Sequence, residues 1–275
     1  MTSEEQAFVN GASRLGVRLD EGHLERFRAY YRELIEWNRS RNLTAITAYG
    51  DVLTRHFLDA LTLVPVMRRL RPDSEGTHAD IHLIDVGTGA GFPGVPLLVV
   101  FPGLRVTLLD SVRKRTEFCE HLVRVLKLPG ASIVTARGEE AGRDPTHRER
   151  YDLAVSRAVD RLPALAEYLL PFCRLGGLAI AMKKGDIAAE VAEAQGPLAF
   201  LGGSEAEIIP VDPVSGLDDD RQLVVMQKIA PTSARYPRRS GLPHRHPLSS
   251  LIRGLPPRHP GRMQYAPTQS TDSAP

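Results

Sequence analysis

The residues best suited to chemistry lie in the stretch LIDVGTGAGFPGVP, residues 83–96, which holds four glycines, two prolines and one acid. Glycines at this density let a ligand come close to the backbone. Counted from Gly89, the stretch fits G-x-G-x-x-G, the pattern of dinucleotide sites. Counted from Asp85, it fits D-x-G-x-G-x-G, which suggests a different nucleotide-like cofactor. The surrounding residues must decide between the two.

Two aspartates favour the second interpretation. Asp85 stands at the end of a strand, before the first glycine, where a carboxylate repels phosphate and suits an ammonium group. Asp110 ends the next predicted strand, TLLD, where a carboxylate can accept hydrogen bonds from both ribose hydroxyls. A ligand with an amino-acid end, a ribose and no phosphate fits this pair. S-adenosylmethionine is such a ligand.

Two further strand ends supply candidate contacts. The segment ARGEEA follows SIVT and can present Gly138 and Glu139 beside an adenine. The strand YDLAVSRA ends at Ser156 and Arg157, above the expected reaction centre. The glycine motif alone is a weak signal, but these residues with Asp110 favour a methyltransferase over a dehydrogenase.

The elements that would position these residues alternate along the chain. From Ile81, short apolar runs alternate with helical stretches, which indicates βαβ units and a parallel sheet. An apolar helix is expected from Leu162 to Cys173. Two strands joined by a Gly/Asp-rich loop within residues 206–229 predict an antiparallel hairpin. The predicted fold is α/β, a class I S-adenosylmethionine-dependent methyltransferase (Rossmann-like) sheet with a C-terminal antiparallel hairpin.

The N-terminal part has a different pattern. In HLERFRAYYRELIEWN an apolar stripe recurs every three or four residues, through Leu24, Phe27, Tyr31 and Leu34. We therefore divide the chain into an N-terminal helical layer (1–75), a methyltransferase domain (76–230), a basic arm (231–248) and a disordered tail (249–275).

Composition excludes several classes of protein. The chain has 275 residues, 42% of them apolar and 25% charged, as in an ordinary globular protein. No apolar run approaches the roughly 20 residues needed to span a bilayer. The cysteines, Cys119 and Cys173, form neither a disulfide framework nor a zinc motif. We expect a cytoplasmic monomer without metal.

Charge is unevenly distributed. The segment 235–275 holds seven arginines and one aspartate, whereas the whole chain carries a net charge of only +2. Nine of the 21 prolines follow Ala230. A basic, proline-rich end on a mildly acidic body suggests an arm for a polyanion, and a solvated tail without a partner is the alternative.

The chain resembles the RsmG (GidB) family of bacterial methyltransferases, which methylate N7 of a guanosine in 16S ribosomal RNA. The resemblance runs from about residue 20 to 248. It is carried in order by NLTAI (42–46), RHFLDAL (55–61), DVGTGAGFPGVPL, LLDSVRKR (108–115), VSRA (155–158), MKKG (182–185) and YPRRSGLPHRHPL (236–248).

The resemblance implies S-adenosylmethionine contacts at Gly87, Phe92, Gly138, Glu139 and Arg157, to which the strand-end argument adds Asp110. Each residue also has a structural alternative. The glycine could serve a turn, the phenylalanine could be core, and the acid could be solvated. The arginine could form a surface ion pair of little energetic value.

The implied reaction needs no general base, because guanine N7 already carries an exposed lone pair. Catalysis should come from positioning N7, the methyl carbon and sulfur in line. Arg157, Asn42 and His56 are candidates for shaping the pocket, although capping or core hydrogen bonding would explain Asn42 and His56.

The implied partner is 16S rRNA or a precursor of the small ribosomal subunit. Duplex RNA hides N7 in a deep, narrow groove, so the guanosine must be unpaired or turned out of its stack. Candidate phosphate-binding residues are Lys184, Arg235, Arg238, Arg239 and Arg245. A small-molecule or protein methyltransferase and a non-catalytic RNA-binding protein remain alternatives.

Overall fold

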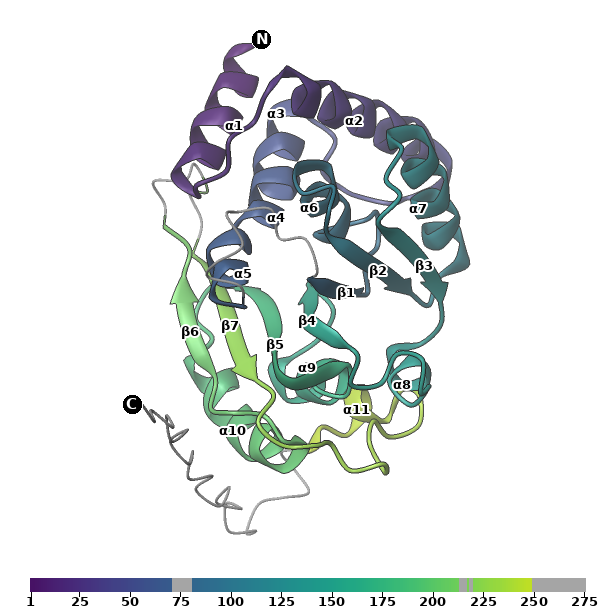
Figure 1. Cartoon of the computed structure of the whole chain (residues 1–275), viewed down its shortest axis with the longest axis vertical. Coiled ribbons are helices and arrows are strands. Elements are labelled where there is room, and N and C mark those ends of the chain that lie inside the picture. The colour runs from purple at the N-terminus through teal and green to yellow at the C-terminus, as the bar shows by residue number, and fades with distance from the viewer. Residues whose placement is uncertain (71–80, 213–216, 218–219, 249–275) are drawn as a thin grey trace, which may run out of the picture.

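A seven-stranded sheet forms the centre of the protein (Figure 1). The structure is a computed structural model and describes residues 1–70, 81–212, 217 and 220–248. The expected disordered tail (249–275) and the expected boundary of the helical layer near residue 75 lie outside the described residues. The strands are β1 (His82–Val86), β2 (Arg105–Asp110), β3 (Ala131–Thr135), β4 (Tyr151–Arg157), β5 (Cys173–Lys184), β6 (Glu207–Pro210) and β7 (Arg221–Gln227).

The strand order is β3-β2-β1-β4-β5-β7-β6. Strands β1 to β5 run parallel, and β7 is antiparallel to both β5 and β6. This is the class I methyltransferase sheet, and it confirms the predicted fold class with its final hairpin. Because β1 to β4 are parallel, their carboxyl ends meet at one edge of the sheet, where such folds bind ligands.

Helices cover both faces of the sheet. They are α1 (Ser3–Arg14), α2 (Glu21–Arg41), α3 (Tyr49–Val52), the π-helix η1 (Leu53–Leu58), α4 (Asp59–Leu61), α5 (Val64–Leu70), α6 (Gly94–Val100), α7 (Arg113–Leu126), α8 (Gly138–Ala141), α9 (Leu162–Leu169), α10 (Ala188–Leu201) and α11 (Leu242–Arg245). The predicted helix over 162–173 is too long, because Cys173 already begins β5. None of the helices in the described ranges is long and apolar enough to cross a membrane.

Alternating side chains place two cores on opposite faces of the sheet. In β4, Leu153 and Val155 join the core under α1, α2, α6 and α7, whereas Ala154 joins the core under α9 and α10. This period of two is the strand geometry that buries both faces. The N-terminal helices therefore share one core with the sheet.

Helix α2 begins at a capping box formed by Asp20 and His23. Its buried stripe is Leu24, Phe27, Tyr30 and Leu34. Tyr31, which the sequence predicts in this stripe, lies at its edge: the residue is partly buried against the core, and its hydroxyl donates to the Thr47 carbonyl (2.9 Å). Tyr30 instead donates to the Ala90 carbonyl at 2.5 Å, so the helical layer touches the glycine loop directly.

Candidate active site

A cavity of about 510 Å³ opens at the carboxyl ends of β1, β2 and β4. Six predicted cofactor residues line it: Gly87, Phe92, Asp110, Gly138, Glu139 and Arg157. His56 lines it too. Asn42 is not on its wall; this residue ends α2 in the left-handed conformation (φ 51°), which fits the capping alternative. The sequence therefore predicted most of one wall.

The glycine loop depends on backbone conformations that favour glycine. Gly87 has φ of +77°, and a Cβ added there would lie 2.5 Å from Val159 Cγ2. The close neighbour of this glycine is thus a side chain from the segment after β4. An alanine at this position would be strained and would also displace Val159.

Asp85 lies beneath the loop, fully buried, and does not line the cavity. Its Oδ2 accepts hydrogen bonds from Thr88 Oγ1 (2.7 Å) and the Gly94 amide (2.9 Å). Its Oδ1 has no partner among the described residues. Burial raises the pKa of this carboxyl to about 6. Direct contact with a ligand ammonium does not fit this placement; the residue supports the loop from below.

Asp110 holds two loops together at the cavity wall. Its Oδ2 accepts from the Gly89 amide (3.0 Å) and from Arg115 Nη1 (3.3 Å), and its Oδ1 accepts from the Val112 amide (2.8 Å). A carboxylate has about four acceptor sites. One site on Oδ1 is therefore left for a hydroxyl on the cavity side.

Glu139 forms another part of the wall, in the short helix α8. The residue is buried, and its Oε1 accepts a hydrogen bond from the Gly241 amide at 2.7 Å. A segment about 100 residues further along the chain therefore closes this side of the cavity. The sequence indicated Glu139 but gave no signal for its partner, the Gly241 amide.

Arg157, at the end of β4, is anchored by a buried carboxylate. Its Nη1 lies 2.8 Å from Asp59 Oδ2, and its guanidinium lies 5.0 Å from the centre of the Phe92 ring. Arg221 pairs with the other oxygen of Asp59. The charge of Arg157 is thus held in place at the cavity wall.

His56 packs against the same phenylalanine, with ring centres 4.4 Å apart. Burial, with the positive charge of Arg157, lowers the pKa of His56 to about 3, so the imidazole is neutral at pH 7. Its Nδ1 lies 3.0 Å from the Arg55 carbonyl and must donate, because a carbonyl only accepts. Nε2 is then an acceptor for the Thr44 hydroxyl at 2.9 Å. Both ring nitrogens are occupied.

Several lining residues could not be identified from the sequence, because their partners are distant along the chain. Gly241 and His244 come from the basic arm, and His244 Nδ1 lies 2.8 Å from Asp160 Oδ2. Thr44 also lines the cavity. The motif YPRRSGLPHRHPL drew attention to the arm, but its charges suggested RNA and gave no signal for a cavity wall.

The predicted RNA-binding residues lie in different settings. The side chains of Arg235, Arg239 and Arg245 are exposed. Lys184 is exposed at the end of β5. Arg238 is different: its guanidinium is 15% exposed and pairs at 2.8 Å with Glu167, which is fully buried. The prediction that Arg238 binds phosphate does not fit this placement, because its charge already neutralises a buried acid.

The described residues include no group of three or more His, Cys, Asp or Glu side chains that could hold a metal ion. Cys119 and Cys173 are both buried and free. Burial raises the pKa of the Cys173 thiol to about 12. Neither thiol is therefore an activated nucleophile.

Comparison with known proteins identifies relatives over most of the chain. A protein of Roseiflexus sp. (strain RS-1) named Ribosomal RNA small subunit methyltransferase G is 45% identical over 240 residues, covering 87% of this chain and 98% of the relative. One of the same name from Dehalococcoides mccartyi is 42% identical over 240 residues, with the same coverage. Among solved structures, the 16S rRNA (adenine(1408)-N(1))-methyltransferase of Catenulisporales acidiphilia matches with a TM-score of 0.44 and 14% identity, covering 62% of this chain and 92% of that one.

The family model described as "rRNA small subunit methyltransferase G", GidB, matches residues 23–214. This span includes the glycine loop, Asp110, Glu139 and Arg157, and it ends before the basic arm. The resemblance seen in the sequence motifs is confirmed. The chain belongs to the rRNA small subunit methyltransferase G family.

Proposed function

We propose that this protein transfers a methyl group from S-adenosylmethionine to N7 of a guanosine in 16S rRNA of the small ribosomal subunit, without a general base. Family membership supports the class of reaction and the rRNA substrate. One observation about the cavity carries the choice of acceptor atom: the buried carboxylates on its wall and the buried imidazole of His56 already have partners in the protein.

The candidate bases on the wall, among the described residues, each have a hydrogen-bond partner in the protein. Asp110 accepts from two amides, and Glu139 accepts from the Gly241 amide. Asp160 pairs with His244, and both nitrogens of His56 are occupied. His244 Nε2 has no partner among the described residues, so an acceptor that must lose a proton would depend on that nitrogen, whereas guanine N7 has an available lone pair and needs no base.

The residues present fit the proposed cofactor. When bound, S-adenosylmethionine supplies an electrophilic methyl group on a sulfonium. Asp110 would hold its ribose through the remaining site on Oδ1, and Gly138 with Glu139 would lie beside its adenine. The loop at Gly87 and the ring of Phe92 would complete the cradle. Arg157, fixed by Asp59, would orient the groups that meet there, so that catalysis depends on positioning.

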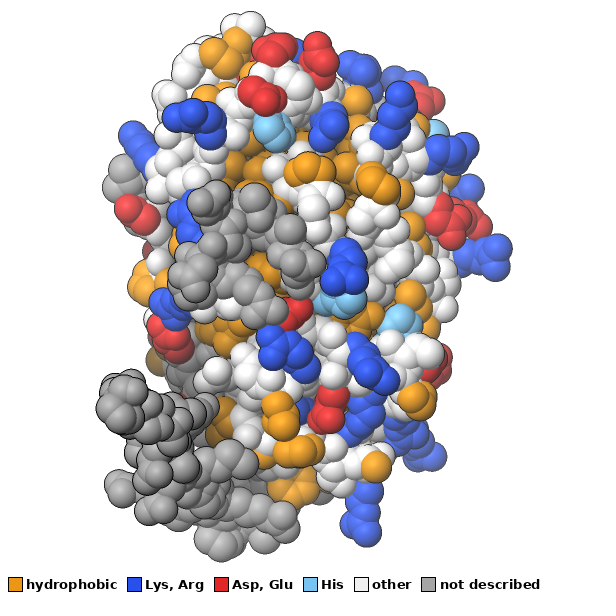
Figure 2. Space-filling view, in the orientation of Figure 1, with side chains coloured by type: hydrophobic (Ala, Val, Ile, Leu, Met, Phe, Trp, Pro, Cys, Tyr) orange, Lys and Arg blue, Asp and Glu red, His pale blue; other side chains and the backbone are white. Residues whose placement is uncertain are grey.

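An exposed basic surface supports the RNA part of the proposal. Figure 2 shows Lys and Arg side chains gathered over the region of α8 and α11. Arg137, before α8, and Arg239, before α11, are exposed, and neither side chain has a hydrogen bond or ion pair among the described residues. With Lys184, Arg235 and Arg245, they would hold phosphates beside the cavity, and the protein would act in the cytoplasm as a monomer.

The test is methylation of rRNA from a strain that lacks this protein. Labelled S-adenosylmethionine is incubated with the protein and either naked 16S rRNA or isolated small subunits, and the product is digested to nucleosides. The expected label is in 7-methylguanosine. Label in another nucleoside would overturn the choice of N7, and no label in either substrate would overturn the proposed function.

A further inference from the structure

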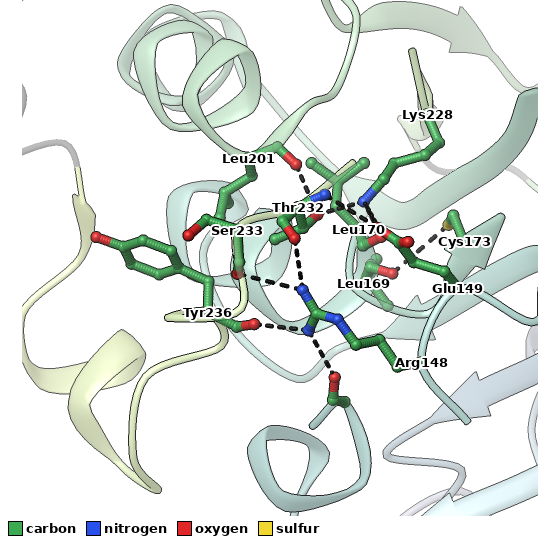
Figure 3. A network of polar contacts seen from close by, with 11 residues as sticks. Arg148, Glu149, Leu169, Leu170, Cys173, Leu201, Lys228, Thr232, Ser233 and Tyr236 are labelled. Carbon is green, nitrogen blue, oxygen red and sulfur yellow. Dashed lines mark hydrogen bonds and ion pairs between the residues drawn. The ribbon is translucent and has the colours of Figure 1, made fainter. Parts of the chain in front are cut away.

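The basic arm, residues 231–248, is held at its start by one arginine. Arg148 Nη1 donates to the Tyr236 carbonyl at 2.7 Å, and its Nη2 donates to the carbonyls of Thr232 (2.6 Å) and Ser233 (3.2 Å), as Figure 3 shows. Nη1 also donates to the Gly142 carbonyl (3.0 Å), just after α8. One guanidinium therefore joins the arm to the element that carries Glu139.

The residue next to Arg148 supports the same point. Glu149 Oε1 accepts from the Thr232 amide at 3.0 Å and lies 3.3 Å from Lys228 Nζ. Lys228 is fully buried and also donates to the Leu170 carbonyl (2.8 Å) and to Thr232 Oγ1. The first residues of the arm are thus fixed by two consecutive side chains and a buried ammonium (Figure 3).

Further along, the arm reaches the cavity. Gly241 donates its amide to Glu139, and His244 pairs with Asp160; all four residues line the cavity. The arm ends, within the described residues, at Leu248, which is buried in the core of α9 and α10. The arm is therefore an ordered part of the cavity wall.

We propose that the arm closes the cofactor pocket and that Arg148 is the positioning residue that holds it closed. If the arm left its place, Glu139 would lose the Gly241 amide that fixes its carboxylate, and the cavity would lose one wall. Arg148 contacts the arm only through backbone carbonyls and does not line the cavity. Its influence on the cofactor must therefore act through the arm. This inference rests on the proposed cofactor, S-adenosylmethionine.

Coupling of this kind works in both directions. A cofactor that binds better to the pocket with the arm in place must also favour the docked arm. Hydrogen exchange can measure this in the unmodified protein. The amides of Thr232, Arg238 and Gly241, which donate to Glu149, Glu167 and Glu139, report on the docked arm.

The first experiment titrates S-adenosylmethionine into four proteins by calorimetry, below the melting temperature of each. Hydrogen bonds to charged groups are the strong class, so Arg148→Gln should weaken binding about tenfold or more. Arg148→Lys keeps the charge and some of the hydrogen bonds, so its affinity should lie between those of the wild type and Arg148→Gln. The matched control is Arg150→Gln, because Arg150 is exposed and the only side-chain bond it makes among the described residues is to the Pro145 carbonyl (3.4 Å). Its dissociation constant should stay within about twofold of the wild type.

The second experiment follows hydrogen exchange in the wild type with and without S-adenosylmethionine. Because it needs no substituted protein, its result does not depend on whether Arg148→Gln folds. The cofactor should slow exchange of amides in residues 232–248 more than in α10. Equal affinity of wild type and Arg148→Gln, or exchange of the arm amides that S-adenosylmethionine does not change, would overturn this inference and leave the proposed function standing. A wild type that does not bind S-adenosylmethionine would overturn the proposed function and this inference with it.

Discussion

Two segments from opposite parts of the chain reach the same cavity, and they are attached in different ways. The N-terminal layer contributes Thr44 and His56, and the arm contributes Gly241 and His244. The layer is held largely by aromatic packing, in which Phe27 lies 4.7 Å from Phe57 between ring centres, and the buried Asp59 adds ion pairs with the sheet. The arm is held largely by hydrogen bonds and ion pairs.

The difference lies in how each attachment responds to change. Aromatic burial has no charge and no preferred partner, so it tolerates salt and pH and depends on filled volume. The arm depends on individual donors facing individual acceptors, as in the pair of Arg238 with Glu167. We therefore expect the layer to share the global stability of the fold and the arm to respond to single polar substitutions.

The largest effect should come from the aromatic cluster. Phe57→Ala removes a fully buried ring that also packs against Tyr30 (5.0 Å) and should lower the free energy of unfolding by about 3–5 kcal/mol. The loss should be the same at low and high salt in urea titrations. The matched control is Phe200→Ala, 36% exposed, for which we expect less than about 1 kcal/mol. A strong salt dependence of the Phe57→Ala loss would break the comparison.

Next in size is the buried ion pair of the arm. Arg238→Ala leaves the Glu167 carboxylate buried with only the Arg238 backbone amide (2.6 Å), and should destabilise the arm by about 3 kcal/mol. Exchange of the arm amides should rise while α2 stays protected. Arg239→Ala, an exposed neighbour without a partner among the described residues, should have almost no effect. Adding Glu167→Gln to Arg238→Ala removes the unpaired charge and should recover much of the loss. Equal exchange in the Arg238→Ala and Arg239→Ala proteins would contradict this account.

A third prediction concerns pH and the buried carboxylate beneath the glycine loop. The pKa of Asp85 is raised to about 6 from 3.8, so the folded protein binds the extra proton between these values. Its contribution to stability is therefore complete below about pH 4 and is lost as pH rises through 6, by roughly 2–3 kcal/mol.

Asp85→Asn tests this directly. An amide oxygen in the place of Oδ2 can accept from both Thr88 and Gly94, so the bonds are kept while the titration is removed. The difference in unfolding free energy between variant and wild type, measured by denaturant titration from pH 4 to 8, should move in favour of the variant as pH rises. A difference that stays constant over this range would show that Asp85 does not titrate there.

The smallest effect should appear in RNA binding. If Arg235 and Arg239 each neutralise one phosphate of unpaired RNA, replacing both with alanine should flatten the slope of log affinity against log salt by roughly 1.4. Filter binding of 16S rRNA at several salt concentrations measures this, beside a thermal melt that should not change. Arg113→Ala, which replaces an exposed arginine of helix α7 paired with Glu117, is the control away from the arm. An unchanged slope would show that Arg235 and Arg239 do not bind RNA phosphates.

Patterns within short windows predicted the sheet and the glycine loop. The alternation of apolar runs located β1 to β5, and the Gly/Asp-rich sequence between the last two strand-like runs predicted the hairpin of β6 and β7. Asp110 and Glu139 could be proposed because strand ends in such a sheet share one edge. These inferences need only local periodicity and a known way of stacking strands.

Contacts between distant segments could not be predicted in this way. The Gly241 amide meets Glu139 across 102 residues, and Arg148 meets Tyr236 across 88. The sequence of a basic motif does not show whether an arginine faces solvent or a buried acid. Arg238 was therefore predicted to bind phosphate, although it pairs with the buried Glu167. Likewise, the sequence favoured Tyr31 over Tyr30 in the stripe on α2, because two adjacent tyrosines fit the helical period equally well.

The hydrogen bonds between Arg148 and the arm also bear on the order in which parts of the protein fold during synthesis. A chain is synthesised from its N-terminus, and its early parts fold first. Arg148, Glu139 and Glu167 therefore leave the ribosome well before the residues that satisfy them, and until then their charges stay hydrated. The sheet can assemble during synthesis, but the cofactor pocket acquires its last wall only after residue 248 has emerged. A nascent chain whose arm is still inside the ribosome, but whose strands have emerged, would accordingly contain a folded sheet with an open pocket.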